Sequence, residues 1–152
     1  MRAALADTLA FLDRLADRAG VAPVLFGTVV LELKGVGDFS AADLDVIVRE
    51  EEAQSLVAAA GVGPGGEGGN DRFRSLLHLH LGGAPLTIDV MAGMSVRTAD
   101  GWVLYDVEET EEIEACGKRF RSASLADLRR FYRLAGRAKD VDKIAALDAL
   151  LT

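Results

Sequence analysis

Two aspartates, Asp43 and Asp45, lie two residues apart in the segment DLDVIV. Alternation along a strand places both carboxylates on the face opposite Leu44 and Val46. Carboxylate groups this close together can share a divalent cation, because hard cations prefer oxygen ligands. The same pattern also fits one aspartate that caps a turn and another that is solvated.

A third carboxylate, Asp89, is predicted to share this face. The segments FRSLLHLHL and PLTIDVM both alternate in hydrophobicity, and the intervening GGA predicts a hairpin turn. If the apolar residues of both segments face one core, Asp89 lies on the other side with His78 and His80. We therefore expect Asp43, Asp45 and Asp89 to converge on one side of a sheet.

Three clustered carboxylates have the chemistry of two-metal phosphoryl or nucleotidyl transfer. Uncompensated, they repel one another, so cations are required, and all-oxygen ligation favours Mg²⁺ or Mn²⁺. His78, His80 and Asp89 form a second candidate set, because His-x-His with an aspartate suits zinc and a small metal-dependent hydrolase. Two partly exposed strand histidines beside an acidic site give the same pattern without zinc.

Regular elements must position these residues. Residues 3–19 carry leucines at spacings of three and four, which predicts a helix with one buried stripe that ends at Gly20. A buried strand is expected at 21–27, a short helix or a continued strand at 28–34, and a helix at 51–61. The order of elements predicts an α/β protein of the α+β type, with a mixed β-sheet and helices packed on one face.

The last part of the chain is predicted to form a helical pair at about 124–151. Ser124 and Asp127 form a pattern similar to a capping box at the start of the first helix. Gly136 marks its end, and a second amphipathic segment follows. We expect residues 1–152 to form a single domain.

Composition excludes several classes of protein. Half of the 152 residues are apolar and 27% are charged, which is typical of a folded domain. The net charge of −7 disfavours a general nucleic-acid binder, which needs a basic surface. No apolar stretch is long enough to span a bilayer, and acids among the N-terminal leucines argue against a secretory signal. With one cysteine and no internal disulfide, the expected compartment is the cytoplasm.

The other patterns are interpreted as structural. The glycine-rich segment 61–71 follows a helix and precedes a strand, which is the reverse of a dinucleotide-binding loop, so we predict a flexible connection. The segment WVLYDV predicts a strand with Trp102 and Tyr105 in the core. The acidic run Asp106–Glu114 is predicted to be a solvated face, and Cys116 a packing residue.

The stretch VLFGTVVLELKGVGDFSAADLDVIV resembles the opening of the nucleotidyltransferase superfamily, the DNA polymerase β-like fold. That family has a strand ending in a turn of small residues, a short helix, a loop and a strand with Asp-x-Asp; its third aspartate matches Asp89. The closing SLADLRRFYRLAGRAKDVDKIAALDAL is similar to the helical tail of the minimal bacterial branch, which includes toxin and antibiotic-modifying enzymes. The matching segments cover 23–49, 84–91 and 124–150.

The resemblance implies transfer of a nucleoside monophosphate from a nucleoside triphosphate to a hydroxyl of an acceptor, with Mg²⁺ or Mn²⁺. The resemblance leaves the acceptor open among RNA, a protein and a small molecule, and it implies no membrane. A protein partner or a homodimer is also compatible with so small a chain. The implied catalytic and metal-binding residues are Asp43, Asp45 and Asp89, with Asp89 as base toward the acceptor. The implied nucleotide-binding residues are Gly27, Thr28, Arg137 and Lys139.

The sequence departs from the family pattern at three places. Phe26-Gly27-Thr28 replaces a pair of small residues, Tyr132 occupies the position of a frequent lysine, and the loop GVGDFSAA lacks the usual Arg-Thr or Arg-Ser pair. The missing cation is expected from one of five residues, namely Arg129, Arg130, Arg133, Arg137 and Lys139. The alternative function is a catalytically degenerate module of the same fold that acts through a protein partner, as toxin–antitoxin components do.

Overall fold

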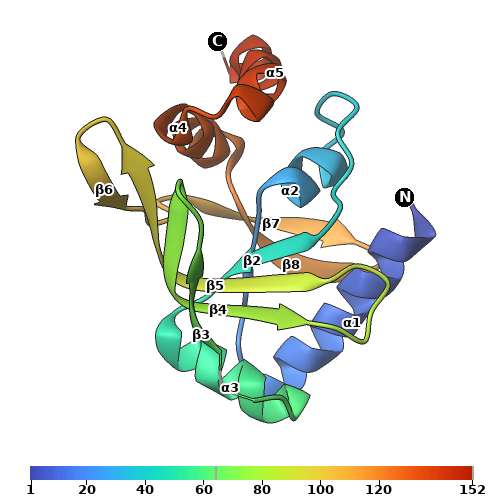
Figure 1. Ribbon diagram of the computed structural model, residues 1–152. Helices are drawn as coiled ribbons and strands as arrows, with labels where there is room; N and C mark the ends of the chain where they lie inside the picture. Colours follow the sequence, from blue (N-terminus) through green and yellow to red (C-terminus); the bar gives the residue numbers. More distant parts are fainter. Residues whose placement is uncertain (64, 152) are drawn as a thin grey trace.

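The computed structural model describes residues 1–63 and 65–151, which form a mixed sheet with five α-helices (Figure 1). The helices are α1 (Ala3–Ala19), α2 (Thr28–Leu33), α3 (Glu50–Ala60), α4 (Leu125–Ala135) and α5 (Val141–Leu151), with a 3₁₀ turn, η1 (Ala138–Asp140). The strands are β1 (Val24–Phe26), β2 (Leu44–Ile47), β3 (Gly66–Gly69), β4 (Phe73–Leu81), β5 (Ile88–Thr98), β6 (Gly101–Leu104), β7 (Thr110–Ala115) and β8 (Lys118–Ala123).

The sheet has the order β3-β4-β5-β2-β1-β8-β7, and β6 pairs with the far part of β5. β2 runs parallel to β5 and antiparallel to β1, while β4 runs antiparallel to β5. The predicted mixed sheet is confirmed. In this order β5 lies between β4, which carries the two histidines, and β2, which carries Asp45.

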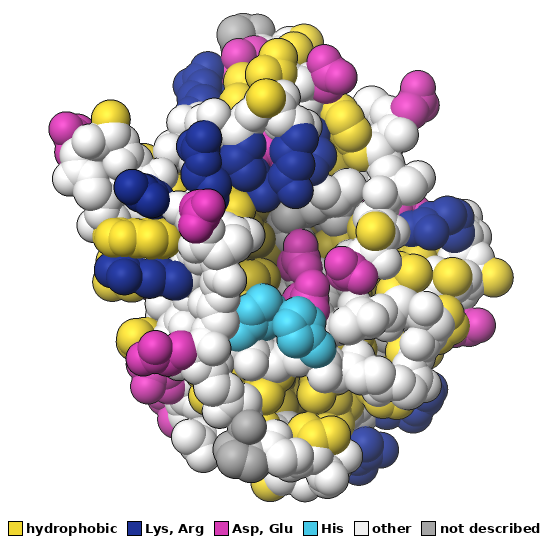
Figure 2. Space-filling view, viewed as in Figure 1, with side chains coloured by type: hydrophobic (Ala, Val, Ile, Leu, Met, Phe, Trp, Pro, Cys, Tyr) yellow, Lys and Arg dark blue, Asp and Glu magenta, His cyan; other side chains and the backbone are white. Residues whose placement is uncertain are grey.

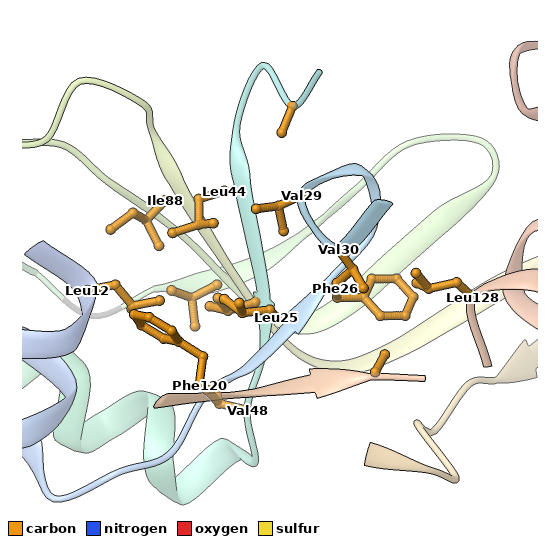
Figure 3. Close-up of a cluster of buried hydrophobic side chains, with 14 of the residues drawn as sticks. Leu12, Leu25, Phe26, Val29, Val30, Leu44, Val48, Ile88, Phe120 and Leu128 are labelled. Carbon is orange, nitrogen blue, oxygen red and sulfur yellow. The ribbon is translucent and has the colours of Figure 1, made fainter. Parts of the chain in front are cut away.

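One face of the sheet packs against α1 and α3 (Figure 1). Leu25, Leu44 and Ile88 project from three neighbouring strands toward Leu12 of α1, and all four are buried (Figure 3). α4 and α5 stand on the other side of the sheet. The apolar face therefore fixes which side of β2 and β5 is left for polar side chains.

The helix ends follow local rules that the sequence shows. Gly20 adopts the left-handed conformation, with φ 69° and ψ 34°, and ends α1. Ser124 accepts a hydrogen bond from the backbone N–H of Asp127 at 3.1 Å, and Gly136 ends α4 at φ 61°. The predicted boundaries of both helices are confirmed, and residues 28–33 are a helix rather than a strand.

The prediction of a flexible connection at 61–71 is wrong for residues 66–69, which form β3 and pair with β4, while residue 64 lies outside the described residues. The strand is made of GEGG, and pairing uses backbone groups that every glycine carries. A Cβ at Gly68 would lie 2.7 Å from Nδ1 of His78, so the glycine lets β3 approach the histidine ring closely.

The chain after Met91 contains more strand than predicted. β5 continues to Thr98, and the acidic run extends into β7, which pairs with a strand that was not predicted, β8. Glu112 and Glu114 on β7 are exposed, so the expected solvated face is confirmed as one face of a strand. Local hydrophobicity misses these strands because they carry many charged residues.

Two predictions of buried side chains are wrong. Cys116 is exposed and, with Gly117, forms the two-residue turn between β7 and β8 at φ values of 55° and 71°. Trp102 is 37% exposed, with the Arg74 guanidinium 4.1 Å from its ring centroid. Tyr105 is buried as predicted. No helix among the described residues is long and apolar enough to cross a bilayer.

Candidate functional site

The predicted convergence of carboxylates is confirmed for Asp45 and Asp89. They are register partners in the parallel pair β2–β5, so their Cα atoms lie side by side on neighbouring strands. The residues on either side of Asp45, Leu44 and Val46, are fully buried on the opposite face. Asp43 directly precedes β2, is exposed, and lies close enough for its charge to act on Asp45.

Asp45 is the most perturbed acid in this cluster. Burial, followed by the negative charges of Asp89 and Asp43, raises the pKa of Asp45 from 3.8 to about 7. A divalent cation beside the three carboxylates would offset this repulsion and stabilise the ionised form of Asp45.

This shift predicts a pH dependence of stability without metal. Between about pH 4 and about pH 7 the folded state keeps a proton on Asp45 that the unfolded chain releases. The contribution of Asp45 is therefore fully present below pH 3.8 and is lost as pH rises toward 7. We therefore expect the free energy of unfolding, measured by melting scans in EDTA, to fall as pH rises over this range. The fall should be smaller in Asp45→Asn than in the wild type. Asp7→Asn, at an exposed position of α1, is the control, and coincident profiles for wild type and Asp45→Asn would contradict the prediction.

A pocket of about 210 Å³ opens beside these carboxylates. Figure 2 shows the hollow, with histidine and acidic side chains on one side and a band of lysine and arginine side chains on the other. The expected phosphate-binding residues, together with Asp45, line it: Gly27, Thr28, Arg137 and Lys139. The structure therefore brings the start of α2, the start of β2 and the η1 turn to one cavity.

A cation that the sequence analysis missed, Lys143 of α5, also lines this pocket. Arg137 donates from Nε to Asp140 at 2.6 Å, and Lys143 donates from Nζ to the same carboxylate at 3.5 Å. Asp140 is completely buried, so it holds both cations at the rim of the pocket. Lys139 and Lys143 are four residues apart, and this helical spacing was the signal that could have revealed Lys143.

The other expected cations point elsewhere. Arg129 and Arg133 both pair with Asp148 of α5, at 3.4 and 2.6 Å. Arg130 pairs at 2.9 Å with Asp127, a buried carboxylate of α4. None of the three is among the residues that line the pocket in the described part of the chain, so the structure does not bring these alternatives to the other expected phosphate-binding residues.

Phe26 and Tyr132, which depart from the family pattern, both contribute to the pocket wall. Phe26 packs edge-on against Phe131 of α4, with ring centroids 4.8 Å apart, so it joins the sheet to the helix. The Tyr132 hydroxyl is buried, lies near Thr28, and has no hydrogen-bond partner in the described ranges 1–63 and 65–151. Buried hydroxyls are normally paired, so this atom is available to a bound polar group.

Gly27 adopts φ 77° and ψ −146°, a region almost restricted to glycine. A Cβ there would lie 3.2 Å from Oδ2 of Asp45. We expect Gly27→Ala to cost about 1–3 kcal/mol in unfolding free energy through backbone strain and to crowd Asp45. Denaturant unfolding and nucleotide titration would measure both effects. Gly20→Ala, also at positive φ but with no atom within 4 Å, should reduce stability alone; equal effects of the two changes on nucleotide affinity would contradict a role for Gly27.

The histidines lie where the alternation placed them, on the face of Asp89. His80 is the register partner of Asp89, and its Nδ1 lies 2.5 Å from Oδ1 of that carboxylate. The ring of His78 lies 4.4 Å from the ring of His80, measured between centroids. Burial, and then the proximity of His80, lower the pKa of His78.

Comparisons with known proteins agree on the fold. No family model and no curated protein matches the chain. A proposed nucleotidyltransferase from Thermotoga maritima, TM1012, has a similar structure with a TM-score of 0.68 and 21% identity, over 91% of this chain and 90% of that one. ANT(2")-Ia, solved in complex with adenylyl-2"-tobramycin, gives a TM-score of 0.56 and 13% identity, over 95% and 88% of the two chains. The chain has the nucleotidyltransferase fold.

Proposed function

We propose that this protein is a divalent-metal-dependent nucleotidyltransferase that moves a nucleoside monophosphate from a nucleoside triphosphate to an acceptor hydroxyl. One observation carries the proposal: Asp45, paired in register with Asp89, lines the same pocket as Gly27 and four cationic side chains, namely Arg74, Arg137, Lys139 and Lys143. Negative charge on one wall suits metal ions, and positive charge on the other suits a triphosphate. The shared fold of TM1012 and ANT(2")-Ia supports this assignment.

Asp43, Asp45 and Asp89 would hold the metal, Mg²⁺ or Mn²⁺. The set fits such an ion because its donors are carboxylate oxygens, and because Asp45 is destabilised by its two neighbours. Gly27 also leaves space beside Oδ2 of Asp45 that any Cβ would fill. When bound, the metal offsets charge on the triphosphate and lowers the pKa of the attacking hydroxyl.

The remaining chemistry belongs to residues around the pocket. Gly27 and Thr28 would bind phosphate oxygens through backbone N–H groups and the threonine hydroxyl. Arg137, Lys139 and Lys143 would bind the outer phosphates, which leave as pyrophosphate. Asp89 would accept the proton of the acceptor hydroxyl as the oxygen attacks the α-phosphorus.

The proposed acceptor is a small hydroxylated molecule, with RNA and a protein side chain as the alternatives to be tested beside it. The net charge of −7 disfavours a large nucleic-acid surface. ANT(2")-Ia was solved with adenylyl-2"-tobramycin, a nucleotide-modified small molecule, which supports this order of testing. The cytoplasm, which supplies triphosphates and Mg²⁺, is the proposed compartment, and a homodimer or protein partner would complete the open side of the cleft.

The test is pyrophosphate release from each of the four common triphosphates with Mg²⁺ or Mn²⁺, in the presence of aminoglycosides, RNA or protein fractions. We expect release that depends on both metal and acceptor and is lost in Asp89→Asn. Triphosphate binding without release in any mixture would favour the degenerate module that acts through a protein partner. Absence of both binding and release would overturn the proposed function.

A further inference from the structure

A second group of potential metal ligands lies next to the carboxylate cluster and shares one member with it. His78, His80 and Asp89 each offer a ligand atom, and these atoms all lie within 4.8 Å of one another. The backbone fixes this proximity: the histidines are two residues apart on one face of β4, and Asp89 lies opposite His80 on β5. The strand register therefore brings the three side chains to one place on the sheet.

The donor types favour a transition metal over Mg²⁺. Two imidazole nitrogens with one carboxylate oxygen are a common zinc set, whereas Mg²⁺ prefers oxygen alone. Donors on one tetrahedral zinc lie roughly 3.3 Å apart when its bonds are about 2.0–2.1 Å long. The side chain of His80 is 66% exposed, so rotation about its own bonds can open the 2.5 Å contact with Asp89 to that spacing.

An independent observation also points to a ligand at this place. Nε2 of His78 is buried and has no hydrogen-bond partner among the residues that the structure describes. Buried ring nitrogens are seldom left unpaired, because the lost hydration is not replaced. A metal ion bonded to the imidazole would remove this cost.

We propose that His78, His80 and Asp89 bind Zn²⁺ or a similar transition-metal ion, and that this binding inhibits nucleotidyl transfer by withdrawing Asp89. The inhibitory half rests on the proposed function. Asp89 lies between two register partners, His80 on β4 and Asp45 on β2. A carboxylate bonded to zinc has its charge neutralised, and a second divalent ion beside it is repelled, so the Mg²⁺ set loses one ligand.

The first experiment is calorimetric titration of metal-free, nucleotide-free protein with Zn²⁺. We expect one ion per chain, and we expect His78→Ala and His80→Asn each to reduce zinc affinity by roughly tenfold or more. Removing a residue that only hydrogen-bonds a metal ligand already weakens metal binding by about that factor, and removing the ligand itself should weaken it at least as much. Asp43→Asn and Cys116→Ser are controls that should leave zinc affinity unchanged. Zinc binding that persists after both histidine changes, or that is absent from the wild type, would overturn the proposal.

The second experiment separates the inhibitory half from the proposed function. With Mg²⁺ and a triphosphate present, one equivalent of Zn²⁺ should abolish the nucleotide-dependent rise in melting temperature of the wild type but not of His80→Asn. Asparagine at this position keeps an amide donor near Asp89 and is a poor zinc ligand. An undiminished rise in zinc-loaded wild type would overturn the inhibition. A wild type that binds zinc through its histidines but shows no rise with any triphosphate would contradict the proposed function and leave the zinc site standing.

Discussion

Asp45→Asn should abolish the stabilisation of this protein by Mg²⁺ and a nucleoside triphosphate. The change removes one ligand from a three-carboxylate set, so metal and phosphates lose their connection to β2. For the wild type, ligand at a hundredfold excess over Kd stabilises the folded state by about 2.7 kcal/mol, which a melting scan detects readily. In EDTA the variant should melt at the same temperature as the wild type or slightly higher, because a neutral side chain avoids repulsion by Asp89 and Asp43.

Asp7→Asn is the matched control, since it removes one negative charge from an exposed position of α1. It should retain the full shift with Mg²⁺ and nucleotide. If Asp45→Asn retained that shift as well, the triphosphate would be binding elsewhere on the molecule, and the metal assignment would be wrong.

Lys139→Met should weaken triphosphate binding by about tenfold, the usual effect of losing one hydrogen bond to a charged group. Lys139 lines the pocket and is exposed, so its removal leaves no buried charge unpaired. The loss should be greatest for a triphosphate and smallest for a monophosphate, because the lysine would bind the outer phosphates. Calorimetry with the three nucleotides in turn would measure this gradient.

Lys118→Met on β8 is the control for net charge, because Lys118 pairs with Asp13 on α1, outside the pocket-lining set. It should bind all three nucleotides like the wild type. Equal losses of nucleotide affinity in the two lysine variants would indicate only long-range attraction between the protein's positive charge and the phosphates. An unchanged affinity in Lys139→Met would exclude Lys139 of the η1 turn from phosphate binding.

The position of Asp89 was predictable because alternation on two neighbouring segments gives side chains only two possible faces. Once the leucines of β4 and Ile88 of β5 enter the core, His80 and Asp89 must share the other face. The C-terminal end of α1 and both ends of α4 followed from residues with local capping preferences, Gly20, Ser124 and Gly136. Each of these features depends on neighbours within a few positions of the chain.

The features that sequence reasoning missed have no clear pattern of hydrophobic or turn-forming residues. β3 is built from glycines, whose backbone pairing with β4 leaves no side-chain pattern. The β7–β8 hairpin turns at Cys116 and Gly117, and the first of these is a residue type that seldom adopts positive φ, so only a single glycine marks the turn. Lys143 pairs with buried Asp140, as Arg137 does, at a spacing of three residues, and counting charges along the sequence does not show that this group lines the pocket.

The most direct test is anomalous diffraction from crystals grown with Mn²⁺ and a non-hydrolysable nucleoside triphosphate. We expect a manganese peak in contact with both Asp45 and Asp89, and triphosphate density between Gly27 and the cations Arg137, Lys139 and Lys143. A manganese peak confined to His78 and His80, with no nucleotide in the pocket, would contradict the proposed nucleotidyl-transfer site.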